Sequence, residues 1–148
     1  MKKILIAYTS RAGNTEQMAA YIAEGVRMAG AEPEVKKISE CKDEKAIQGY
    51  DGYIFGCPTY HRDMTEGMKR FLFLAKKAGL EGKVGGAFGS YTHSGDAPGS
   101  ILDTMQNVFE MEVSDLGSLL IKEKIVPTNE CLRACQAYGR SIGEKVAG

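Results

Sequence analysis

Residues 4–15 read Ile-Leu-Ile-Ala-Tyr-Thr-Ser-Arg-Ala-Gly-Asn-Thr, an apolar run followed at once by a small polar loop. Unbroken apolarity at residues 4–8 predicts a strand that is covered on both faces. A helical pattern follows the loop and ends at Gly30, a typical stop signal. Its apolar face consists of Met18, Ile22, Val26 and Ala29. This stretch therefore predicts one strand–loop–helix unit.

The same unit recurs along the chain. Apolar runs at residues 52–56 and 84–88 are each followed by a helical pattern, the first entered by Asp63 and Glu66 in capping-box spacing. The helix after residues 84–88 starts behind Asp96 and Pro98. The remaining elements are a weaker strand at 35–38, a short helix at 43–48, a last strand at 119–121 and a last helix opened by Pro127 and Thr128. The alternation predicts an α/β fold, a doubly wound parallel sheet of five strands with helices on both faces.

Length and charge narrow the class of protein. The 148 residues predict one domain, 1–148, and 19 basic against 19 acidic residues give a net charge of zero, which argues against a general nucleic-acid binder. No apolar stretch reaches the length of a membrane helix, and the apolar start is too short for a signal peptide. Four irregularly spaced cysteines do not suggest a disulfide framework, so we expect a soluble, cytoplasmic protein without membrane insertion.

Ligands of such sheets bind beyond the carboxyl ends of the strands, so the loops there are the candidate site. The first loop, residues 9–15, offers three hydroxyls, one amide and a row of backbone N–H groups at a helix N-terminus, which together suit a terminal monophosphate. It has neither the nucleoside-triphosphate pattern nor the dinucleotide pattern. An equally weighted alternative is that Ser, Thr and Asn serve here only as helix caps and turn formers.

The second and third loops carry aromatic side chains and glycine. Residues 56–64 contain Pro58, which stiffens the exit from the strand, and Tyr60 and His61, which are candidate platforms for a flat ring. The alternative is an ordinary surface tyrosine, a solvated histidine and an Arg62 that pairs with Asp63. Residues 89–99 form a loop that is long for this fold and dense in glycine, as functional loops often are.

Taken together, the three loops resemble those of the flavodoxin family. The phosphate loop of that family is matched by Thr9, Ser10, Gly13, Asn14 and Thr15; Pro58-Thr59-Tyr60 is similar to its ring loop, with Cys57 in place of Ser; Tyr91 matches the tyrosine that stacks on the flavin. Residues 88–91 and 94–97 look most like the flavodoxin domain of A-type flavoproteins. The resemblance implies strand order 2-1-3-4-5 and bound flavin mononucleotide (FMN). Arg11 departs from the family pattern, and either adds to phosphate binding or points to solvent.

The resemblance implies a flavodoxin, a low-potential carrier that passes electrons between redox partner proteins through non-covalently bound FMN, as a monomer or weak dimer. It implies no catalytic side chains and no metal. The alternative is an FMN-dependent NAD(P)H:quinone oxidoreductase. Cys131 and Cys135 are interpreted as buried, inert thiols, whereas Cys57 lies next to the expected ring site. The expected cofactor contacts are Thr9, Ser10, Arg11, Ala12, Gly13, Asn14, Thr15, Pro58, Thr59, Tyr60, His61, Arg62, Gly89, Ser90, Tyr91, Gly95 and Asp96.

Overall fold

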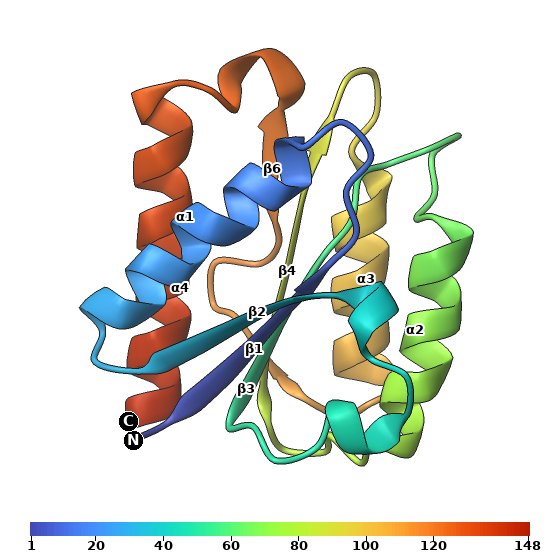
Figure 1. Cartoon of the computed structure of the whole chain (residues 1–148), viewed down its shortest axis with the longest axis vertical. Coiled ribbons are helices and arrows are strands. Elements are labelled where there is room, and N and C mark those ends of the chain that lie inside the picture. The colour runs from blue at the N-terminus through green and yellow to red at the C-terminus, as the bar shows by residue number, and fades with distance from the viewer.

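A parallel sheet forms the centre of the molecule, and helices cover both of its faces (Figure 1). In the computed structural model, which describes all 148 residues, the strands are β1 (Lys3–Tyr8), β2 (Glu32–Lys37), β3 (Gly52–Gly56), β4 (Val84–Tyr91), β5 (Glu112–Val113) and β6 (Leu119–Lys122). The helices are α1 (Asn14–Met28), α2 (Glu66–Lys77), α3 (Asp96–Asn107) and α4 (Asn129–Ala147), with short 3-10 turns η1 (Ile38–Glu40), η2 (Glu44–Ala46) and η3 (Glu123–Ile125). The order β2-β1-β3-β4-β5 confirms the predicted class and strand order.

The fifth position of the sheet is divided between two short strands. β4 pairs with β5 at Val84 and Gly85, and pairs with β6 over its other half, from Phe88 to Tyr91. The predicted last strand corresponds to β6, whereas β5 was not predicted. Its two residues include only one apolar side chain, too little for a periodic signal. β4 also extends to Tyr91, three residues beyond the predicted apolar run.

The start of α2 differs from the predicted one. Its N-cap is Thr65, whose Oγ1 accepts a hydrogen bond from the backbone N–H of Met68 at 3.2 Å. The expected cap residue, Asp63, instead closes a backbone turn with Tyr60 and places its carboxylate 2.6 Å from Nζ of Lys69. The prediction of Asp63 as the cap is therefore wrong, because a residue that closes this turn lies too early in the chain to cap the helix.

Two apolar layers hold the helices on the sheet. In β1, Ile4 and Ile6 pack toward α1 and α4, while Leu5 and Ala7 pack toward α2 and α3. All four side chains are completely buried, as expected for a strand covered on both faces. No helix combines the length and apolar character needed to cross a bilayer.

Glycine allows α1 and α4 to touch backbone to backbone. A Cβ atom at Gly139 of α4 would lie 2.1 Å from the carbonyl oxygen of Ile22, and one at Gly25 of α1 would lie 2.0 Å from the carbonyl oxygen of Gln136. Both distances are far below van der Waals contact, so these positions exclude any side chain. The two helices lie side by side on one face of the sheet (Figure 1).

Candidate functional site

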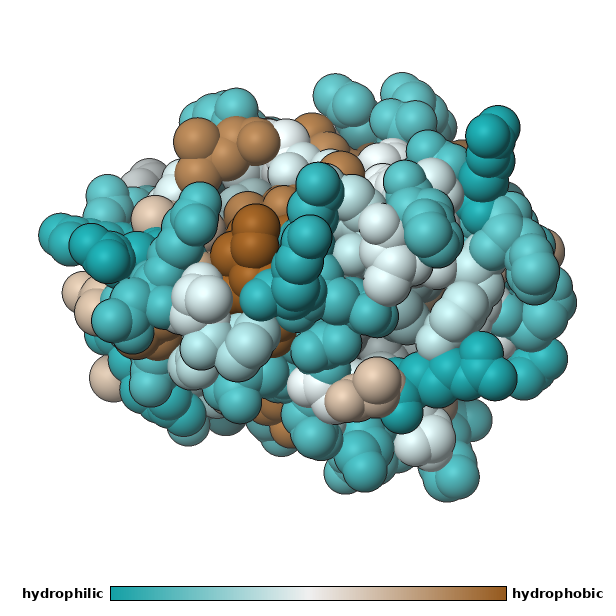
Figure 2. Space-filling view, turned by 90° about the horizontal axis from the view of Figure 1, so that it is seen from above, coloured by the Kyte–Doolittle hydropathy of each residue, from teal (hydrophilic) through white to brown (hydrophobic).

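The loops that follow β1, β3 and β4 meet at one end of the sheet, at the top of Figure 1. Figure 2 looks down on this end and shows mostly hydrophilic side chains with a few small apolar patches. Since all three strands are parallel, their carboxyl ends necessarily lie at the same edge. The sheet thus brings together three loops that are far apart in the sequence.

Unused hydrogen-bond donors line the first loop. Thr9 N donates to the carbonyl of Gly56 at 3.0 Å, which ties the loop to β3, and Ser10 Oγ accepts from Gly13 N at 3.1 Å. Gly13 has φ +89°, a left-handed conformation that turns the chain into α1. The backbone N–H groups of residues 10–12 and 14–16 donate to no acceptor within the protein. Six free donors beside the positive end of a helix dipole make a site for an anion.

One hydroxyl of this loop points elsewhere. Thr15 is buried, and its Oγ1 lies 3.4 Å from Oγ of Ser90, which is equally buried in β4. This contact joins the first loop to the third. Thr15 and Ser90 were both expected to contact a ligand through the loops, and the structure places their side chains against each other.

A tight turn shapes the second loop. The backbone groups of Tyr60 and Asp63 exchange two hydrogen bonds, N to O at 2.7 and 2.8 Å, around two central residues. These residues, His61 and Arg62, have φ +48° and +62°, as a type I′ turn requires. Such turns normally use Gly, Asn or Asp, so the conformation costs about 1 kcal/mol or more at each residue. Both side chains are exposed at the tip of the loop.

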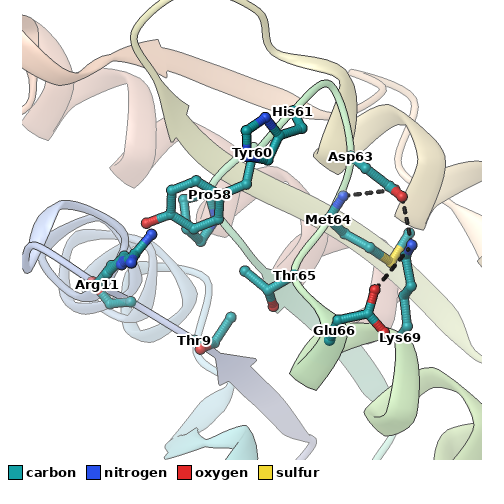
Figure 3. A pocket seen from close by; sticks show the side chains of 11 residues that line it. Thr9, Arg11, Pro58, Tyr60, His61, Asp63, Met64, Thr65, Glu66 and Lys69 are labelled. Atoms are coloured by element: carbon teal, nitrogen blue, oxygen red, sulfur yellow. Dashed lines mark hydrogen bonds and ion pairs between the residues drawn. The ribbon is translucent and has the colours of Figure 1, made fainter.

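Arg11 reaches across from the first loop to the second. Its guanidinium carbon lies 4.8 Å from the centre of the Tyr60 ring, a cation–π contact that closes over one side of a cavity of about 520 Å³ (Figure 3). Arg11 therefore does not simply point to solvent. The cavity is lined by Thr9, Ser10, Arg11, Pro58, Tyr60, His61, Asp63, Met64, Thr65, Glu66 and Lys69.

A charged group from the start of α2 borders the same cavity. Nζ of Lys69 lies 2.6 Å from Asp63 and 3.5 Å from Glu66 (Figure 3). The hydrogen bond from Lys69 lowers the pKa of Asp63, and the same contact raises the pKa of Lys69. Arg62 was considered as the partner of Asp63, but Lys69 takes that role. The sequence analysis missed this group, although the three-residue spacing of Asp63, Glu66 and Lys69 would have indicated it.

The second and third loops enclose a separate cavity. It measures about 410 Å³ and lies between residues 59–62 and 92–94. A hydrogen bond from Ala97 N to Thr59 Oγ1, 3.1 Å long, fastens the two loops to each other. Gly89 is buried beneath them, where a Cβ atom would lie 2.1 Å from the carbonyl oxygen of Cys57. Gly89 thus allows the two loops to approach.

Several expected site residues lie at the margin of these cavities. Half-buried Tyr91 faces a neighbouring cavity of about 420 Å³ that it shares with Thr92 and residues 122–124. Gly95 is the N-cap of α3 and packs against Leu120. Three further residues, Ala12, Asn14 and Asp96, line none of the cavities described here.

The cysteines are buried and free. Sγ of Cys57 faces the start of α2 and accepts a hydrogen bond from Thr65 N at 3.4 Å. Burial raises the pKa of the Cys57 thiol, which disfavours the reactive thiolate. Cys131 and Cys135 are fully buried with their sulfur atoms 3.8 Å apart, and burial raises the pKa of both. The prediction that these two are buried is confirmed.

Known proteins share both the sequence pattern and the fold. A family model described as Flavodoxin matches residues 6–133. A flavodoxin of Clostridium saccharobutylicum is 41% identical over 87 residues, which are 58% of this chain and 54% of that protein. A putative diflavin flavoprotein A 4 of Synechocystis sp. is 29% identical over 147 residues, 97% of this chain but 24% of that protein. A solved archaeal flavodoxin superposes with a TM-score of 0.88 at 30% identity, covering 99% of each chain. The chain therefore spans about half and about a quarter of the length of the two curated relatives.

Proposed function

Because the chain belongs to the flavodoxin family, we propose that it binds FMN without a covalent bond and carries electrons between redox proteins. FMN supplies the redox chemistry, since its ring system takes up and releases electrons. The protein supplies binding, orientation and electrostatics. The observation that carries the proposal is the row of free backbone N–H groups at residues 10–12 and 14–16, next to cavities bordered by aromatic side chains.

The first loop would hold the phosphate group. Its six free N–H donors and the N-terminus of α1 suit a doubly charged anion. The nearest carboxylate in the helix, that of Glu16, already accepts a hydrogen bond from the Tyr8 hydroxyl at 2.7 Å. Burial, followed by that contact, raises the pKa of Tyr8 to about 12, so Tyr8 remains a neutral donor to Glu16.

The second and third loops would hold the ring system. The cavity of about 410 Å³ between them falls within the size range of small-molecule sites, about 300–1,000 Å³. Tyr60 and Tyr91 would border the ring, and backbone groups of residues 89–95 would meet its polar edge. Residues 1–148 would act as one FMN-binding domain whose partners are other redox proteins.

Ligand binding is the direct test of this function. We expect the apoprotein to quench the fluorescence of added FMN on binding at micromolar concentration. Riboflavin, which lacks the phosphate, should bind at least about 100-fold more weakly, because two charge-assisted hydrogen bonds already contribute about 3 kcal/mol. Equal affinity for the two ligands would contradict the phosphate site, and no binding of either would contradict the proposed function.

Turnover with a nicotinamide cofactor separates the carrier from the alternative enzyme. We expect the FMN-loaded protein alone to show negligible steady-state oxidation of NADH or NADPH when a quinone is present. The protein should instead accept electrons from a reduced redox protein and pass them on. Sustained quinone reduction by NADPH would assign the chain to the NAD(P)H:quinone oxidoreductases.

Arg11 is expected to act through Tyr60 and not on the phosphate. The Arg11→Ala change removes the contact at 4.8 Å, which contributes about 0.5–2 kcal/mol, so FMN and riboflavin should both bind about 3- to 30-fold more weakly. In a Tyr60→Leu background the same change should have little further effect. A loss of affinity for FMN alone would show that Arg11 contacts the phosphate. Fluorescence titration of the wild type, the two single variants and the double variant with both ligands decides between these outcomes.

A further inference from the structure

Four basic side chains border the ring site on the side away from the first loop. We call Arg62, His93, Lys122 and Lys124 the cationic rim. Arg62 and His93 line the cavity of about 410 Å³, and the two lysines line the adjacent cavity of about 420 Å³. Thr92 lines both cavities, so the rim is one continuous surface.

The sheet places this rim next to the proposed flavin contact. Lys122, the last residue of β6, lies in register with Tyr91 on the neighbouring strand β4. Lys124 follows in η3, while Arg62 occupies the exposed tip of the type I′ turn. The rim therefore stands at the carboxyl ends of the strands, where an electron-transfer partner must approach the ring.

The positive charge of the rim is not neutralised within the protein. All four side chains are exposed, and none forms an ion pair or hydrogen bond. Among the residues that line the two cavities, the only carboxylate is that of half-buried Glu123; Asp96 and Glu130 stand farther along, at the starts of α3 and α4. The cavity linings therefore carry three permanent cations, Arg62, Lys122 and Lys124, against one acid.

Carboxylates that follow the first and second loops are already engaged. Asp63 and Glu66 both contact Lys69, and Glu16 accepts from the Tyr8 hydroxyl. The chain as a whole has a net charge of zero, so the excess is a local property of this surface. A local field of one sign steers a partner of opposite sign and fixes its orientation.

We propose that the cationic rim is the docking surface for an acidic electron-transfer protein. The proposal rests on the proposed carrier function, which requires a partner to approach the ring edge. A basic partner would meet three unpaired cations at this surface, whereas an acidic partner would pair its carboxylates with them. The rim thus selects partners by the sign of their charge.

Electron transfer to two probe proteins of opposite charge tests this assignment. The FMN-loaded protein, reduced under anaerobic conditions, is mixed with acidic plastocyanin or with basic cytochrome c in a stopped-flow instrument. Between about 10 and about 500 mM ionic strength, the rate with plastocyanin should fall about tenfold or more. The rate with cytochrome c should stay level or rise. A plastocyanin rate that is independent of salt would overturn the proposal.

Reversing the charge of rim residues tests whether the cationic rim controls the rate of electron transfer to plastocyanin. The double change Lys122→Glu and Lys124→Glu, measured at saturating FMN, should lower the plastocyanin rate about tenfold or more at low salt. The matched control, Lys42→Glu with Lys45→Glu, makes the same change of charge at exposed positions near η2, at the opposite end of the molecule (Figure 1). Equal losses in both double variants would show that overall charge and not the rim controls the rate. Failure to reduce either probe despite bound FMN would contradict the carrier function itself.

Discussion

The Gly139→Ala variant is expected to unfold with a free energy about 2–3 kcal/mol below that of the wild type. The added Cβ would lie 2.1 Å from the carbonyl oxygen of Ile22 and 3.1 Å from the backbone nitrogen of Val26. Both are main-chain atoms of α1, so no side chain can rotate away to make room. The contact is relieved only when α1 and α4 move apart, which loosens the apolar layer between them and the sheet.

Urea denaturation followed by far-ultraviolet circular dichroism measures this effect. The matched control is Gly67→Ala in α2, where the nearest atom to an added Cβ is the Ile38 Cδ1 at 3.6 Å. That variant should gain about 0.5–1 kcal/mol, because alanine loses less backbone entropy than glycine on forming a helix. If both alanine variants were more stable than the wild type, the backbone contact between α1 and α4 at Gly139 would be contradicted.

The elements that could be predicted from the sequence are those whose pattern of apolar residues lies within one short segment. The runs at 4–8, 52–56 and 84–88 predicted β1, β3 and β4, because a strand buried on both faces must be apolar throughout. β5 could not be predicted in this way, since it has two residues and is held only by its pairing with Val84 and Gly85. The interpretation of Gly25 likewise depends on the carbonyl of Gln136, which no local pattern brings near.

The candidate site likewise has a part that local sequence patterns predict and a part that depends on contacts in the folded protein. Strand-end loops could be located from sequence, because the carboxyl ends of parallel strands share one edge. The orientation of individual side chains could not. Thr15 turns inward to Ser90 and Arg11 lies over Tyr60, and both contacts join segments that only the folded sheet places together.

Glycine at position 89 is the most restrictive requirement of the proposed ring site. We expect Gly89→Ala to weaken FMN binding about 10- to 100-fold. Its Cβ would lie 2.1 Å from the carbonyl oxygen of Cys57 and 3.0 Å from Cγ of Pro98. Relief of this overlap must shift the second loop, the third loop or both. An overlap that costs about 1–3 kcal/mol in the bound geometry reduces affinity by the stated factor.

The matched control for this prediction lies in the same region. Gly99 lies in the first turn of α3, next to the Pro98 that an alanine at position 89 would contact. The Gly99→Ala change adds a Cβ that meets no atom within 4 Å, so the affinity for FMN should remain that of the wild type. Fluorescence titration with FMN and riboflavin separates the two parts of the ligand. Gly89 sets the spacing of the second and third loops and not the position of the first loop. The affinities for FMN and for riboflavin should therefore fall by the same factor. Unchanged binding by Gly89→Ala would mean that the ring lies outside the space between the second and third loops.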